Sequence, residues 1–195
     1  RQQIGTGFRP RYLRLLHALC GDVRAVSAIE FAMIAPIVIL LYIGAVEIGN
    51  LLTIYRRTDV VVSTAADLVA QNKTTTKSDL SDVVAAATSV LNPSPSYTTA
   101  KPKLVLSSVV ADANNNGKVA WSYASAGASP RGKNTNYTVP TGLTEASSSV
   151  IVAEVSYDFT PLVNLPRFFS PGSFTLKRTF YSRPRRSLTV SCSDC

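Results

Sequence analysis

The sequence has little histidine and little charge. His17 is the single histidine among 195 residues, and Asp, Glu, Lys and Arg together make up 16% of the chain. Sites that need two imidazole ligands are therefore excluded, and any nucleophilic triad would have to use His17. A charged fraction below the usual value of about 25% also argues against a disordered chain and favours a membrane segment. We expect no enzymatic activity and no cofactor.

The positive charge is spread over the chain. Twenty Lys and Arg residues outnumber twelve Asp and Glu residues, which gives a net charge of +8. Residues 1–29 contribute +4, residues 30–71 contribute −2, and residues 72–195 contribute +6. A nucleic-acid-binding protein typically gathers its cations on one face that follows the phosphate backbone. The sequence therefore predicts no nucleic-acid partner.

One long apolar run stands out. Residues 31–46 (FAMIAPIVILLYIGAV) carry no charge, and apolar residues extend the run in both directions, which predicts one transmembrane helix over residues 26–55. The uncharged part alone spans about 24 Å, so Glu30 and Glu47, which bracket it, should lie near the membrane interfaces. Pro36 is tolerable inside such a helix. Five arginines before the run place the N-terminus in the cytoplasm and the residues after the run across the membrane, by the positive-inside rule.

The helical pattern continues beyond the apolar run. Apolar residues recur at helical spacing through Ile48, Leu52 and Tyr55 and on to Val62 and Val69, which predicts an amphipathic stalk over residues 56–71. This face could pack within the chain or against a neighbouring copy, and the sequence does not separate the two. A second, short helix is predicted from an N-cap at Ser78 to about Leu91.

The remaining sequence is typical of strands. Segments rich in β-branched and aromatic residues lie at 103–111, 118–125, 150–159 and 174–183, and a polar loop occupies 126–149. These patterns predict an α+β fold: a long N-terminal transmembrane and stalk helix, one short helix and a small antiparallel sheet of about four strands. The head domain would comprise residues 72–195, on the outer side of the membrane.

Several segments resemble one bacterial family. The stretch Arg24 to Tyr42 (RAVSAIEFAMIAPIVILLY) combines basic residues, a run of small residues, Glu-Phe-Ala and an apolar helix with an early proline. In these features it resembles the TadE/TadG-like pseudopilins of tight-adherence (Flp-type) pilus systems. The likeness continues at VEIG (46–49), ADLVAQ (66–71), WSY (121–123), VAEVSY (152–157) and FYSRPR (180–185).

The resemblance implies a type IV pilin-like precursor with a basic cytoplasmic leader over residues 1–25. A prepilin peptidase would cut between Ala25 and Val26, so that Glu30 becomes the fifth residue and is followed by Phe31. This chain has Ala25 where the family usually has glycine. After cleavage the new amino group of Val26 could pair with Glu30, and without cleavage Arg24 could do so. Glu30, Pro36 and Glu47 would then set helix register during assembly.

The implied function is that of a structural or assembly subunit in pilus biogenesis and surface adhesion. Its partners would be the inner membrane, other pilus subunits and assembly proteins, and the prepilin peptidase. The alternative is a permanently anchored envelope module, which binds through its head and never enters a filament. Cleavage of the leader distinguishes the two.

Two further motifs suggest sites in the head. Asp112, Asn114, Asn116 and Gly117 match the first half of a calcium loop, but Tyr123 stands where the bidentate glutamate is needed, so a plain turn is favoured. Cys192 and Cys195 form a C-x-x-C pair that could make a disulfide, within the chain or between subunits. No metal site is expected.

Overall fold

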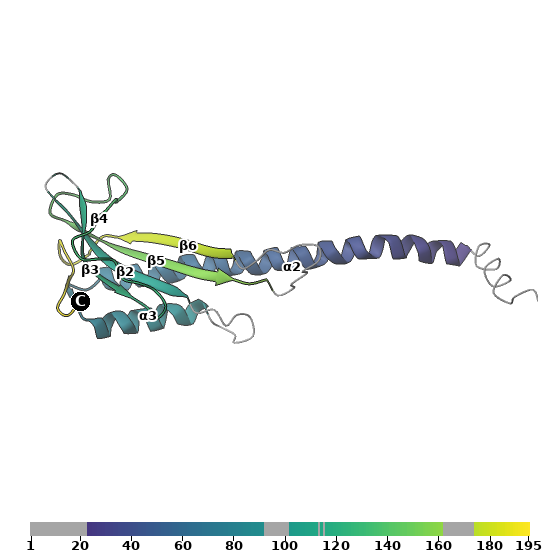
Figure 1. Cartoon of the computed structure of the whole chain (residues 1–195), viewed down its shortest axis with the longest axis horizontal. Coiled ribbons are helices and arrows are strands. Elements are labelled where there is room, and N and C mark those ends of the chain that lie inside the picture. Colours follow the sequence, from purple (N-terminus) through teal and green to yellow (C-terminus); the bar gives the residue numbers. More distant parts are fainter. Residues whose placement is uncertain (1–22, 92–101, 113, 115, 162–173) are drawn as a thin grey trace, which may run out of the picture. The chain divides into compact units, whose positions relative to one another are not determined.

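The structure is a computed structural model that describes residues 23–91, 102–112, 114, 116–161 and 174–195 (Figure 1). Two compact units make up the chain, Arg1–Val46 and Glu47–Cys195. Most of the predicted leader, with His17 and Cys20, lies outside the described residues. The predicted α+β fold is confirmed, with two helices and an antiparallel sheet among the described residues.

Helix α2, Val23–Ala70, is 48 residues long and runs through both units, with Pro36 inside it. From Thr58 onward it buries one face, which consists of Thr58, Val61, Val62, Ala65, Ala66, Val69 and Ala70. Leu51 and Ile54 pack against the edge of the same core, whereas Ile48 and Leu52 are exposed. The predicted amphipathic face therefore packs within the chain only from about Leu51 onward.

Helix α3, Lys77–Leu91, begins with a capping box. The Asp79 N–H donates to Thr76 Oγ1 at 3.2 Å, and the Thr76 N–H donates to Asp79 Oδ2 at 2.9 Å. The predicted N-cap at Ser78 is thus wrong, because Thr76 satisfies the free N–H groups and Ser78 lies inside the first turn. Leu80, Val84, Ala87 and Leu91 recur at helical spacing and are buried.

A five-stranded antiparallel sheet has the order β4-β3-β2-β5-β6. Its strands are β2 (Lys103–Ala111), β3 (Gly117–Ala124), β4 (Asn136–Tyr137), β5 (Ser149–Phe159) and β6 (Phe174–Ser182). The four predicted strands are therefore present, and β4 adds a short fifth one from the predicted loop. A separate parallel pair joins β1 (Thr74–Thr75) to β7 (Ser191–Cys192).

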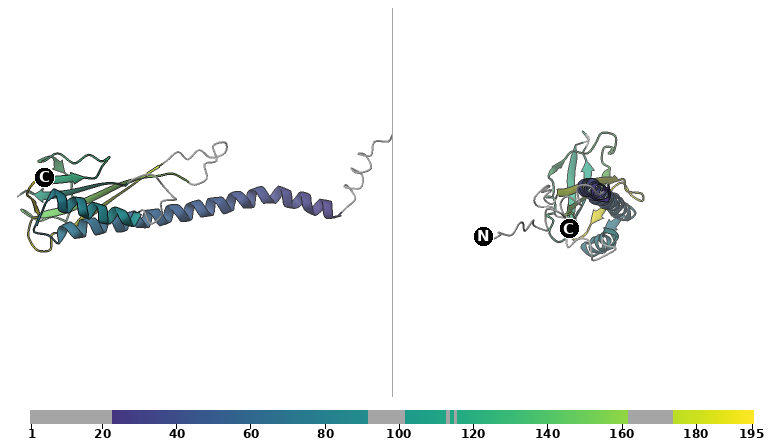
Figure 2. Two further views of the ribbon diagram at one scale, coloured as in Figure 1. Left: turned by 90° about the horizontal axis from the view of Figure 1, so that it is seen from below. Right: turned by 90° about the vertical axis from the view of Figure 1, so that its right-hand side faces the viewer.

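The sheet has an apolar cluster on each face. On one face α3 and the second half of α2 pack over alternate β5 residues, including Ile151, Ala153 and Val155 (Figure 2). The intervening residues Val150 and Val152 point to the opposite face, where they pack with Val109, Val119 and side chains from the 126–149 segment. Because strand side chains alternate between faces and both faces are covered, eight of the eleven β5 residues are buried.

Gly117 is required by the close approach of β4 to β3. A Cβ atom at this position would lie 2.4 Å from the Tyr137 carbonyl oxygen and 2.8 Å from Val109. We predict that Gly117→Ala lowers the free energy of unfolding by about 2 kcal/mol, within the range of overpacking substitutions. Denaturant unfolding followed by the fluorescence of Trp121, the single tryptophan, measures this.

The matched control is Gly49→Ala, because an added Cβ at this helical glycine meets nothing within 4 Å. Alanine also favours the helix, so no destabilisation is expected. Equal losses of stability in both variants would contradict the steric explanation.

Candidate functional site

The first part of α2 is the candidate site for anchoring and assembly. Among the described residues, one helix, Val26–Ala70, is long and apolar enough to cross a membrane by its length and composition. Its apolar side chains up to Val46 are largely exposed, with Phe31 at 73% and Leu41 at 69%. Such a surface is stable in lipid or against other apolar helices and unfavourable in water.

The sequence-predicted residues of this segment lie along one unbroken helix. Glu30, Phe31 and Pro36 are exposed, and the helix continues through Pro36. Ala25 and Val26 also lie within α2. Glu47 is half-buried and is the first residue of the second unit. The structure thus orders these residues along a helix rather than gathering them into a pocket.

Within the second unit, Arg178 ties β6 to α2. The Arg178 Nε lies 2.9 Å from the Asp59 carboxylate, and its guanidinium lies 3.8 Å from the centroid of the Tyr55 ring. Since Tyr55 and Asp59 are four residues apart, they share one helix face and both reach the same cation. Sequence reasoning missed Arg178 because nothing local signals its partner more than 100 residues away.

The C-terminal segment holds the two helices and the sheet together. Backbone N–H groups of Arg185, Ser191 and Ser193 donate to the carbonyls of Ala70, Lys73 and Thr75, respectively. The first of these bonds satisfies a carbonyl at the end of α2, where no intrahelical donor remains. Backbone hydrogen bonds therefore join residues 70–75 to residues 185–193.

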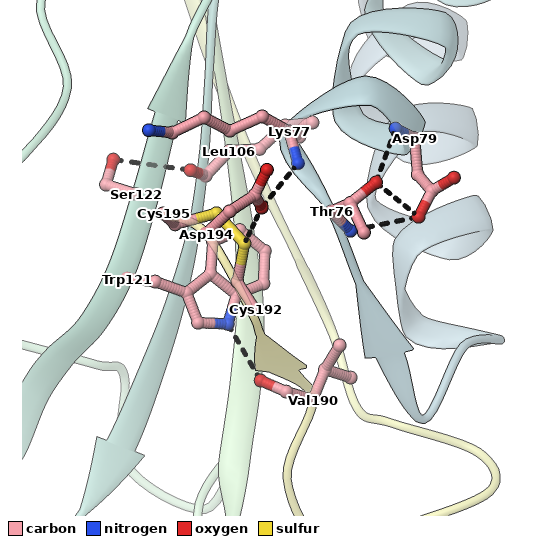
Figure 3. The surroundings of a disulfide bond; sticks show 10 residues. All are labelled: Thr76, Lys77, Asp79, Leu106, Trp121, Ser122, Val190, Cys192, Asp194 and Cys195. Carbon is pink, nitrogen blue, oxygen red and sulfur yellow. Dashed lines mark hydrogen bonds between the residues drawn. A yellow bond between two sulfur atoms is a disulfide. The ribbon is translucent and has the colours of Figure 1, made fainter.

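A disulfide joins Cys192 and Cys195 beside the start of α3 (Figure 3). Between them, Asp194 accepts the Lys77 N–H at 2.8 Å, which places a carboxylate at the N-terminus of α3. On the sheet side, the buried Trp121 Nε1–H donates to the Val190 carbonyl at 2.8 Å. Cys192, Asp194 and Cys195 also lie close enough to share a metal ion, but the disulfide occupies both sulfur atoms.

The candidate calcium residues form a hydrogen-bonded turn. Asp112 Oδ1 accepts the N–H groups of Asn114 and Asn116, and Oδ2 accepts the Asn116 side-chain amide. These bonds, chiefly from the Asn116 backbone, lower the pKa of the Asp112 carboxyl from 3.8. The carboxylate thus serves as a cap for the β2–β3 turn.

A polar cluster lies on the sheet face opposite the helices. Arg131 makes two hydrogen bonds to the Glu154 carboxylate, at 2.8 and 2.7 Å, and lies 4.7 Å from the centroid of the Tyr137 ring. The hydrogen bond to Glu154 raises the pKa of Arg131. Burial and the Tyr181 hydroxyl raise the pKa of Tyr137. These groups satisfy one another and fix the 126–149 segment to the sheet.

The disulfide should stabilise the head. We predict that Cys192→Ser/Cys195→Ser lowers the free energy of unfolding by about 2 kcal/mol, as expected for the entropy of closing a four-residue loop. Trp121 fluorescence reports the transition, because its indole is bonded to the same segment. Cys20→Ser is the control. A loss of stability in Cys20→Ser, or no loss of stability in the double variant, would argue against a stabilising role for the disulfide.

The Asp112 turn should make stability depend on pH. Because the pKa of Asp112 is lower in the folded chain than its unfolded value of 3.8, its contribution is present above that pH and disappears as the pH falls through the lowered pKa. Asp112→Asn keeps an acceptor but removes the charge. We expect the variant to be less stable than the parent at pH 6 and the difference to shrink as the pH is lowered below 3.8, measured by urea unfolding. A constant difference across this range would exclude the charge as the cause.

Comparison with known proteins finds a similarity that includes the apolar segment. Residues 25–67 match the family described as TadE-like protein, which covers 43 of the 195 residues. This match confirms the resemblance over these residues, which include the apolar segment and the start of the buried part of α2. No significant match was found among curated proteins or among solved structures.

Proposed function

We propose that this chain is a pseudopilin-like structural subunit of a tight-adherence type IV pilus, acting in pilus biogenesis and surface adhesion. The observation that carries the proposal is α2 itself. Its first part exposes an apolar surface, its second part is a core element of a folded head, and the TadE-like match spans both.

The exposed part of α2 provides anchoring and lateral packing. In the inner membrane its apolar side chains contact lipid, and in an assembly they pack against the helices of other subunits. The arginines before the span remain in the cytoplasm, and residues after it lie on the periplasmic side or, within a pilus, at the cell surface. The disulfide between Cys192 and Cys195 suits that oxidising side.

Glu30 supplies the specificity of assembly. A carboxylate at the start of a membrane span is costly unless a cation meets it. Cleavage between Ala25 and Val26 by a prepilin peptidase creates an α-amino cation four residues before Glu30, on the same helix face. A pair between Glu30 of one subunit and the amino group of another would fix the axial position of neighbouring helices, while Pro36 and Glu47 set the helix register.

The second candidate function is a permanently anchored envelope module that does not enter a filament. The observation that favours it is Ala25, which occupies the position before the cut where the family usually has glycine. In this case the leader stays attached, Arg24 is the partner of Glu30, and the head alone makes the functional contacts.

The mature N-terminus decides between these functions. We predict that mass spectrometry of the protein isolated from its native host finds a chain that begins at Val26. Ala25→Gly should leave this N-terminus unchanged and accelerate processing. A mature protein that retains the basic leader would contradict the filament proposal and support the anchored module.

Glu30→Ala tests the register role directly. We expect the variant to insert into the membrane but to reduce the recovery of assembled pili at least tenfold, because the pairing cation loses its partner. Asp82→Ala, which removes an exposed carboxylate from α3, is the matched control and should assemble normally. Normal assembly of Glu30→Ala would exclude the proposed pairing.

A further inference from the structure

Three exposed or partly exposed cations of the second unit make no ion pair with the residues that the structure describes. We propose that Arg56, Arg57 and Lys177 form a basic collar that binds the anionic headgroups of phospholipids in the leaflet facing the head. This inference rests on the membrane anchoring in the proposed function and adds a partner for the head. The first two residues belong to α2, and the third belongs to β6.

The packing of the head limits how far the membrane can extend along α2. Leu51 and Ile54 contact the head core, so this part of the helix is not surrounded by lipid. The hydrocarbon layer must therefore end near Asn50. At 1.5 Å per residue, the backbone of Arg56 lies about 9 Å beyond Asn50. The headgroup layer on each side of a bilayer is roughly 5–8 Å thick, and a long arginine side chain covers the remaining distance.

Lys177 reaches the same level from the sheet. Arg178 contacts Asp59, and further along both elements Arg185 contacts Asp67, so β6 and the segment after it run alongside α2 in the same direction. Lys177 precedes Arg178 and therefore lies on the side toward Arg56 and Arg57. In the sheet, Lys177 of β6 pairs with Ser156 of β5, and Ser156 pairs with Lys103 of β2 on its other side. A second lysine therefore lies in the same row.

Two acids close to these cations are already paired. Asp59 pairs with Arg178, and Asp158 pairs with Lys103 at 3.2 Å and accepts a bond from Thr175. No ion pair within the described ranges involves Arg56, Arg57 or Lys177, and all three are at least partly exposed. A net positive rim at headgroup depth is the arrangement that attracts anionic lipid.

The Tyr55–Arg178–Asp59 contact gives the collar a fixed shape. This contact joins α2 to β6 next to the collar residues: Arg56 and Arg57 lie between Tyr55 and Asp59 in sequence, and Lys177 precedes Arg178. Because the two elements are bound to each other there, Lys177, which points to the sheet face opposite α2, is held at a fixed level along the helix relative to Arg56 and Arg57. The collar is thus a feature of the folded head rather than of a flexible tail.

The test uses the full chain reconstituted in phosphatidylcholine vesicles with trace spin-labelled lipid. Electron paramagnetic resonance measures the motionally restricted lipid at the protein, and hence the association of phosphatidylglycerol relative to phosphatidylcholine. We expect this preference to fall about fivefold for each cation removed, and therefore further in Arg56→Gln/Arg57→Gln than in Lys177→Gln, in line with the usual effect of juxtamembrane cations. Raised salt should reduce the preference in the parent chain.

The matched control is Lys73→Gln/Arg186→Gln, which removes two exposed cations from the segments that meet at the other end of the helix–sheet contact. It should keep the parent preference. An unchanged preference in Arg56→Gln/Arg57→Gln, or an equal fall in the control, would overturn the collar while leaving the anchor intact. Absence of any restricted lipid, for either headgroup, would instead overturn the anchoring and the collar with it.

Discussion

The structure depends on one helix, α2, whose two parts need different surroundings: the first part needs an apolar environment, and the second part needs the core of the head. The first part of α2 exposes Phe31, Leu41 and their apolar neighbours, which is favourable only where water is absent. The part after Thr58 places small and β-branched residues, such as Val62 and Ala66, under a sheet. The change occurs within a few residues around Leu51, so the sequence there must satisfy lipid or a partner helix on one side and a protein core on the other.

The head is closed by contacts between residues far apart in the sequence. The C-terminal segment satisfies the last carbonyl of α2 through Arg185, places Asp194 at the start of α3, and accepts the indole hydrogen of Trp121 through Val190. Each bond satisfies a group that would otherwise be costly to leave unpaired. The disulfide between Cys192 and Cys195 lies in this same segment, which has little secondary structure. By limiting the conformations of the segment, it helps to preserve all of these hydrogen bonds at once.

Much of this fold could be predicted from the sequence, because strong local patterns determine it. The uncharged run, the alternation in the four long strands and the helical spacing in α2 are signals that extend over many residues. The sequence predicts Ser78 as the N-cap of α3, because serine is a common N-cap residue, but Thr76 and Asp79 form the reciprocal pair. The partners of Arg178 and Val190, the strand β4 and the β1–β7 pair depend on tertiary contacts that short segments do not encode.

The distribution of polar and apolar groups over the described residues indicates where partners are expected. In the head, conspicuous polar groups are engaged with one another: Arg131 with Glu154, Asp112 with its own turn, and Asp194 with Lys77. Sixteen of nineteen exposed large hydrophobic residues lie in α2. A surface that gains free energy mainly by burying apolar area favours association over chemistry, and α2 is where that area is concentrated. Under the proposed function, the partners of this chain would therefore be the lipids or helices that cover the exposed part of α2.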